Sequence, residues 1–156
     1  MSFALACASV FAETVDFGGL KFNLTPDGKA VLTSGKAALG TVVIPHSVRG
    51  HKVTEIKANA FQGNTDIRSI IIPATVQRIG ACAFYDCKEL SKVEMHSTAD
   101  RIEDFVFAHC EQLESISLPQ GITNIGRNAF ENCTSLKNVD IPRSCESIDS
   151  YAFNAC

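Results

Sequence analysis

A phenylalanine recurs every 23 residues between positions 61 and 153, and this spacing restricts the fold more strongly than any other feature of the sequence. The recurring residues are Phe61, Phe84, Phe107, Phe130 and Phe153. A fixed period of this length is typical of stacked-repeat proteins, in which each repeat forms one coil of a solenoid. Because equivalent side chains of successive coils form rows over a broad surface, such folds usually bind other macromolecules. The period therefore predicts a solenoid and favours a binding function.

Apolar side chains follow the same period in five columns. A single short coil cannot bury these side chains alone, but coils stacked in register cover one another and form a continuous core. The columns are Ile44, Ile72, Met95, Leu118, Ile141; Val53, Val76, Ala99, Ile122, Cys145; Ile56, Ile79, Ile102, Ile125, Ile148; Ile67, Leu90, Leu113, Leu136; and Ile70, Val93, Ile116, Val139.

The columns also predict the shape of each coil. Val139 and Ile141 alternate with polar neighbours, as in a short strand whose inward side chains are two residues apart. Proline at positions 45, 73, 119 and 142 ends this strand, because it cannot donate to a ladder. The stretch that follows is too short for a full helix. We therefore expect an α/β-type repeat solenoid, with a parallel β-sheet on one face and short helical turns or irregular segments on the other.

Three segments are expected along the chain. Residues 1–12 contain an unbroken run of small and apolar side chains, which resembles the remnant of a secretory signal peptide; a buried N-terminal strand is the alternative. Residues 13–40 are expected to form a capping β-hairpin, because alternating apolar residues precede a turn sequence and a second strand. Residues 41–156 are expected to form about five coils, the last one incomplete, of a longer array.

Composition and cysteine spacing exclude several kinds of site. A formal net charge of −3 without a basic stripe argues against a nucleic-acid partner. Four of the seven cysteines, Cys87, Cys110, Cys133 and Cys156, follow successive phenylalanines by three residues, which favours a ladder of buried free thiols over disulfides or a zinc site. We expect no metal, no cofactor and no transmembrane segment in the mature chain.

An enzyme needs an activated nucleophile or a paired acid and base. The adjacent His109 and Cys110 are the sole neighbouring pair of this kind, and consecutive residues of a coil point in different directions. Because Cys110 also belongs to the cysteine ladder, we expect no catalytic activity.

The recurring elements IP, IG, AF and C-x-x-L, as in IPATVQRIGACAFYDCKEL, resemble the BspA-like leucine-rich repeats of surface proteins from Bacteroidetes, treponemes and some protist parasites. The resemblance covers residues 41–156, and the segment VDFGGLKFNLTPDGKAVL is similar to the leader before such repeats in gut bacteria. The resemblance implies a leucine-rich repeat solenoid in a secreted or cell-surface protein. Such a protein would act as an adhesin for host matrix, host cells or other bacteria. The ligand would be a protein or glycoprotein.

Strand alternation predicts which side chains form the exposed face of the sheet. The candidate ligand-binding residues are Ser69, Ile71, Lys92, Glu94, Ser115, Ser117, Asn138 and Asp140, with His96 at the edge where one coil lacks proline. An ordinary solvated sheet is the alternative for this face. For the whole chain, the alternatives are a structural spacer or an intracellular protein-interaction scaffold.

Overall fold

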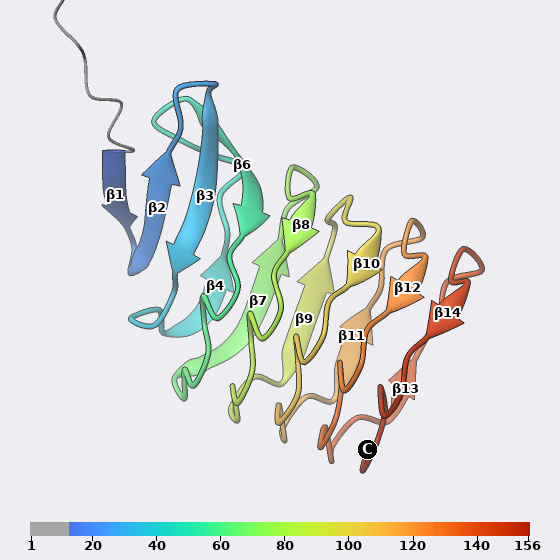
Figure 1. Cartoon of the computed structure of the whole chain (residues 1–156). Helices are drawn as coiled ribbons and strands as arrows, with labels where there is room; N and C mark the ends of the chain where they lie inside the picture. Colours follow the sequence, from blue (N-terminus) through green and yellow to red (C-terminus); the bar gives the residue numbers. More distant parts are fainter. Residues whose placement is uncertain (1–12) are drawn as a thin grey trace, which may run out of the picture.

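The computed structural model describes residues 13–156 as an elongated β-solenoid (Figure 1). The predicted signal segment, residues 1–12, lies outside the described residues. The strands are β1 (Glu13–Phe17), β2 (Leu20–Leu24), β3 (Lys29–Ser34), β4 (Gly40–Val43), β5 (Ser47–Val48), β6 (His51–Ile56), β7 (Ile67–Ile72), β8 (Arg78–Ile79), β9 (Lys92–Met95), β10 (Arg101–Ile102), β11 (Ser115–Ser117), β12 (Asn124–Ile125), β13 (Asn138–Val139) and β14 (Ser147–Ile148).

A parallel five-stranded sheet runs along one side in the order β13-β11-β9-β7-β4. We call it the ligand-face sheet because it carries the residues predicted from the sequence as a candidate binding face. From β7 onward each strand lies one repeat of 23 residues from the next, so Ser69 pairs with Lys92 and Lys92 with Ser115. Between β4 and β7 the offset is larger, because Thr41 pairs with Ser69. The first coil carries extra residues here, and they form the antiparallel pair β5–β6.

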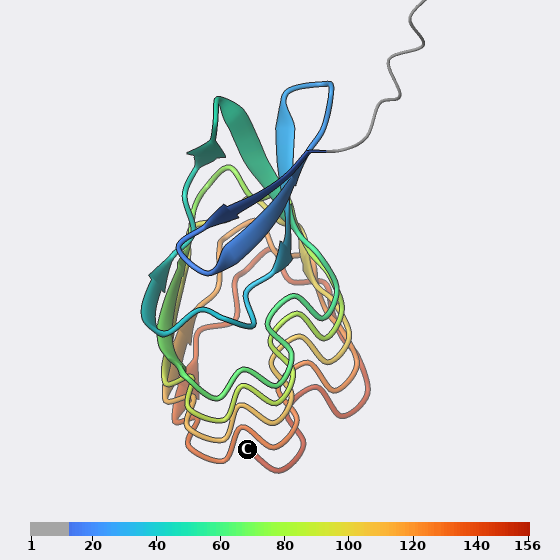
Figure 2. The same cartoon turned by 90° about the vertical axis from the view of Figure 1, so that its left-hand side faces the viewer.

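The second strand of each coil belongs to another side of the solenoid. There β8 pairs with β6, and β10, β12 and β14 form a separate parallel sheet. Viewed along the stack, successive coils lie almost directly behind one another (Figure 2). The in-register stacking predicted from the period is therefore confirmed.

The core follows the predicted columns. The five phenylalanine rings stack face to face, with centroids 4.9–5.5 Å apart. Beside them, the Sγ atoms of Cys87, Cys110 and Cys133 each donate to the carbonyl oxygen of a phenylalanine one coil earlier, at 3.1–3.2 Å. The ladder of buried thiols is confirmed for these three cysteines. Cys156 in the last coil makes the same bond to Phe130 but is exposed, and the cysteines at positions 82–156 are free.

The last coil departs from the predicted core. Ile141 and Ile148 belong to the apolar columns, yet they are 40% and 50% exposed. A column residue is buried by the coil that stacks on it, and within residues 13–156 no coil covers these two. The continuous core predicted from the columns therefore stops short of these two positions.

The expected short helical turns are not found: residues 13–156 contain strands, turns and bends but no helix. Each coil instead places residues two before and two after its phenylalanine in the left-handed region. The non-glycine examples are Asn59, Cys82, Asp86, Phe105, His109, Asn128, Asn132, Tyr151 and Ala155, with φ of 54–61°. Left-handed residues interrupt a right-handed helix, so the chain here forms hydrogen-bonded turns, the irregular segments of our expectation.

The N-terminal segment covers the first coil. Strands β1, β2 and β3 form an antiparallel sheet, and β3 joins the solenoid by pairing in parallel with β6. After β3, Gly35 lies directly against the Phe61 ring, where a Cβ atom would overlap the ring carbons. Asn64 occupies the cysteine position of this coil, and its side-chain amide donates to the carbonyls of Gly35 and Ala38. The segment thus shields the first phenylalanine from water.

Candidate functional site

The predicted binding residues lie in two rows on the exposed face of the ligand-face sheet. One row is Ser69, Lys92, Ser115 and Asn138, and the other is Ile71, Glu94 and Ser117. His96 directly follows β9, and Asp140 follows β13. Most of these side chains are exposed; Ser69, Ile71 and Glu94 are half-buried. The sheet therefore gathers the predicted residues along one surface.

A charged cluster occupies the middle of this face. Lys92 Nζ lies 2.6 Å from Glu94 Oε1, and His96 Nε2 lies 4.0 Å from Glu94 Oε2. The hydrogen bond from Lys92 lowers the pKa of Glu94, so the carboxylate is ionised at neutral pH. The backbone of His96 donates to Ile72 at 2.9 Å, a bond that proline at this position in other coils cannot make.

The two rows continue onto β4, which the sequence did not indicate. Thr41 pairs with Ser69, and Ser69 Oγ donates to Thr41 Oγ1 at 3.0 Å. Val43 pairs with Ile71 and is 61% exposed, while Leu39 just before β4 is 68% exposed. The insertion in the first coil breaks the 23-residue offset, so projection of the period alone cannot find these positions. The column that aligns Ile44 with Ile72, read with strand alternation, was the available signal.

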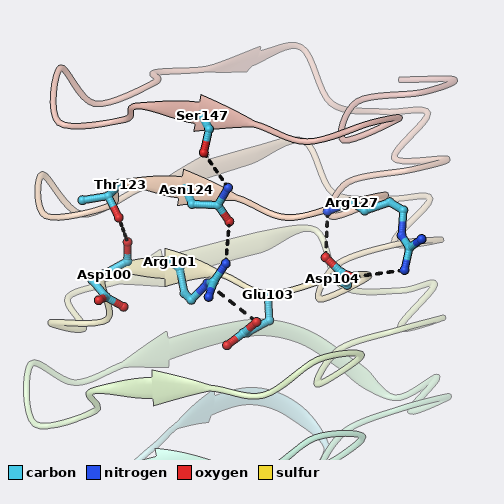
Figure 3. A network of polar contacts seen from close by, with 8 residues as sticks. All are labelled: Asp100, Arg101, Glu103, Asp104, Thr123, Asn124, Arg127 and Ser147. Carbon is cyan, nitrogen blue, oxygen red and sulfur yellow. Dashed lines mark hydrogen bonds and ion pairs between the residues drawn. The ribbon is translucent and has the colours of Figure 1, made fainter.

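A second polar network lies on another side of the solenoid (Figure 3). Arg101 Nη2 donates to Asn124 Oδ1 at 3.1 Å, and Asn124 Nδ2 donates to Ser147 Oγ at 2.7 Å. Arg127 donates from its backbone to Asp104 Oδ1 at 2.8 Å and from its guanidinium to Asp104 Oδ2 at 3.3 Å. These side chains bond to one another across coils, which is a structural role.

The geometry around Cys110 does not resemble a catalytic site. Burial raises the pKa of Cys110 well above its usual range, whereas a nucleophilic cysteine needs an accessible thiolate. The His109 ring instead packs edge-on against Tyr85, with centroids 5.2 Å apart. Among residues 13–156, no group of three His, Cys, Asp or Glu side chains is placed to hold a metal ion. No helix in the same range is long and apolar enough to span a membrane.

Comparison with known families gives one match over most of the chain. The family model described as "BspA type Leucine rich repeat region" matches residues 36–156 in six copies. No curated protein matches the chain.

Several solved structures are similar over nearly the whole chain. A leucine-rich repeat protein of T. pallidum is 30% identical with a TM-score of 0.81, covering 91% of this chain and 67% of that one. A leucine-rich repeat protein of Bacteroides ovatus is 26% identical with a TM-score of 0.71, covering 86% of this chain and 37% of that one. A leucine-rich cell surface protein of Faecalibacterium prausnitzii is 26% identical with a TM-score of 0.65, covering 94% of this chain and 47% of that one. The chain therefore spans less than half of the latter two proteins.

Proposed function

We propose, from the premise that this chain belongs to the BspA-type leucine-rich repeat family, that it is the non-enzymatic protein-binding part of a secreted or cell-surface protein. Its partner is a protein or glycoprotein of host matrix, host cells or other bacteria. The similar Faecalibacterium prausnitzii structure is described as a cell surface protein, which supports the location. Leucine-rich repeats form a protein-interaction fold, which supports the kind of partner.

The observation that carries this proposal is the contrast between the two polar surfaces. Around Arg101, Asn124 and Ser147, side chains satisfy one another across the coils. On the ligand-face sheet, the side chains of Ser115, Ser117, Asn138 and Asp140 make no hydrogen bond or ion pair with another residue of the range 13–156. These polar groups point outward in register and are available to a ligand. Because they repeat from coil to coil, several weak contacts can add through effective concentration.

A charge-matched pair of variants tests the surface. The triple variant Lys92→Ala, Glu94→Ala, Asp140→Ala removes one cation and two anions from the ligand-face sheet. The control Arg78→Ala, Asp100→Ala, Glu146→Ala removes the same charges from exposed positions near the second strands of three coils. Binding to purified matrix proteins, epithelial cells and bacterial cells would be measured for both. We expect at least about tenfold weaker binding for the first variant alone, which corresponds to about 1.4 kcal/mol.

Equal binding by the native protein and the first variant would reject this face as the binding surface. Urea unfolding of both variants shows whether the fold is retained. Because all six side chains are at least partly exposed, we expect each variant to unfold within about 1 kcal/mol of the native protein.

The location is tested separately by protease treatment of intact source cells, followed by mass spectrometry of the released peptides. Release from intact cells, with a mature N-terminus at Glu13, is the expected result for an exported protein. Peptides that appear only after lysis, with Met1 retained, would instead identify an intracellular scaffold.

A further inference from the structure

The N-terminal cap extends only one side of the solenoid. Strands β3, β2 and β1 continue the sheet that contains β6, whereas the ligand-face sheet ends at β4 in the same coil. In the view along the stack, the three cap strands lie to one side of β4, and no strand lies in front of it (Figure 2). Strand β4 pairs with β7 and with no other described strand. Its second edge is therefore open.

The open edge presents backbone hydrogen-bonding groups at defined positions. The N–H of Ile44 donates to the carbonyl of Ile71 in β7 at 3.1 Å. Consecutive residues of a strand direct their N–H and C=O groups to opposite sides, so Val42 and Ile44 face β7 while Thr41 and Val43 face away. Within residues 13–156, no bond outside the ladder engages the backbone of Thr41 or Val43. Two donors and two acceptors thus stand at strand spacing along this edge.

The side chains beside this edge are uncharged and partly apolar. Residues 38–45 read ALGTVVIP and contain no charged residue. Val43 is 61% and Leu39 68% exposed, so both present a large apolar surface to water. Proteins usually protect such edges with lysine, with a covering segment or with a bulge. Here a register shift between Gly40 and Thr41 is present, but within residues 13–156 neither a charge nor a covering strand protects Val43.

We propose that the open edge of β4 binds an extended, uncharged segment of a partner polypeptide, which adds a sixth strand to the ligand-face sheet. An extended backbone supplies acceptors and donors at the spacing that Thr41 and Val43 require. Alternate apolar side chains of that segment contact Val43 and Leu39. The added strand continues the rows of the candidate face. The inference rests on the proposed function in one respect, namely that the partner is a protein.

The geometry favours a single segment over a second copy of this chain. One added strand needs a width of about 5 Å beside β4. A second copy joined edge to edge would add its own three-stranded cap at this end of the solenoid, where the first cap already lies to one side of β4 (Figure 2). An unfolded or loop segment of a partner has no such bulk.

A synthetic peptide provides the direct probe. The peptide has a Thr-Val-Thr-Val-Thr centre with lysine at each end for solubility, and its control carries N-methyl groups on all five central amides. Amide exchange of the full chain is followed by NMR during titration with each peptide. We expect exchange at Thr41 and Val43 to slow by at least about tenfold with the first peptide, and to be unchanged with the control. Val42 and Ile44, already bonded to β7, serve as internal references.

Variants of one residue separate the backbone bond from other effects. Val43→Pro removes the outward N–H but leaves the bonds of β4 to β7, because proline is tolerated where the N–H faces outward on an edge strand. It should bind the peptide at least about tenfold more weakly. Val43→Thr keeps the N–H and the branched shape, and should bind within about threefold of the native protein. If Val43→Pro fails to fold, Val43→Lys replaces it, because a charge at the edge should also abolish strand addition.

Two results would overturn the inference: equal binding of the peptide and its N-methylated control, or equal binding by the native protein and Val43→Pro. The variants also separate it from the proposed function. If the Lys92, Glu94, Asp140 triple variant loses matrix or cell binding while Val43→Pro retains it, the face is the binding surface and the β4 inference fails alone. If the triple variant binds normally, the face is rejected as the binding surface, and the peptide titration still decides the β4 edge.

Discussion

Asn64→Ala is expected to destabilise the protein strongly, because the side chain joins the N-terminal segment to the first coil. Asn64 is 3% exposed. Its Nδ2 donates to the carbonyls of Gly35 at 2.9 Å and Ala38 at 3.0 Å. Its Oδ1 accepts from the backbone amides of Asp66 at 2.8 Å and Ile67 at 3.0 Å. Alanine removes these four bonds, together with a longer contact of 3.4 Å from Nδ2 to the Lys36 carbonyl, and leaves the backbone groups without these partners.

The size of the effect follows from these contacts. A hydrogen bond contributes about 1 kcal/mol net, so four bonds correspond to about 4 kcal/mol of unfolding free energy. Asn64→Cys provides an internal comparison. In the later coils the cysteine at this position donates to the carbonyl 26 residues earlier, and the bond from Asn64 to Ala38 spans the same separation. Cysteine can therefore keep one of the four bonds, and its expected loss is about 3 kcal/mol.

Urea unfolding followed by circular dichroism measures both losses. Asn154→Ala is the control, because Asn154 is exposed and its side chain makes one contact of 3.3 Å, to Glu131. The control should lose less than about 0.5 kcal/mol. A loss below about 1 kcal/mol for Asn64→Ala would show that water replaces the four bonds at little cost and would refute the role assigned to this side chain.

Three further predictions concern the core and its thiols. Phe107→Ala should lower the free energy of unfolding in urea by about 4 kcal/mol, because Phe107 stacks between two rings. Phe153→Ala, with one ring neighbour, should lower it by less than half as much. Equal losses would argue against the stack. Gly35→Ala should lower the free energy of unfolding by about 2 kcal/mol, because the new Cβ overlaps the Phe61 ring. Gly121→Ala has open space around the new Cβ and should change the free energy of unfolding by under about 0.5 kcal/mol. Burial raises the pKa of Cys110, so iodoacetamide at pH 8 should label this thiol in urea but not in the native protein. Peptide mass spectrometry measures the labelling, and rapid labelling of the native protein would contradict the burial of Cys110.

Sequence periodicity was sufficient for the stacked core. Phe84, Phe107 and Phe130 occupy equivalent places in successive coils, so a constant offset of 23 residues places them in contact. The cysteine ladder follows from the same offset. The exposed rows through Lys92 and Ser115 were also predictable, since side chains alternate across a strand with a period of two.

Other features depended on contacts that no period describes. Val43 was missed because the candidate rows were projected with the 23-residue period, which the insertion in the first coil interrupts, although the column that aligns Ile44 with Ile72 places Val43 beside Ile71. Asn64 stands in the cysteine column, but its role arises from the fold of residues 35–38, which lie outside the repeat. The expected short helical turns do not form, because two residues per coil adopt positive φ. Asn59, Gly63 and Asn132 at these positions were the available signal, since Asn and Gly tolerate that region best.

The most direct test of the proposed binding face is site-specific photo-crosslinking. A benzophenone amino acid would be placed at Ser117 on the ligand-face sheet and, in a second protein, at Arg78 on the other side of the solenoid. Both proteins would be irradiated on the matrix protein or cell surface that binds the native chain. We predict a crosslinked partner from Ser117 and none from Arg78. Crosslinking from Arg78 alone, or equally from both positions, would contradict the assignment of the ligand-face sheet as the binding surface.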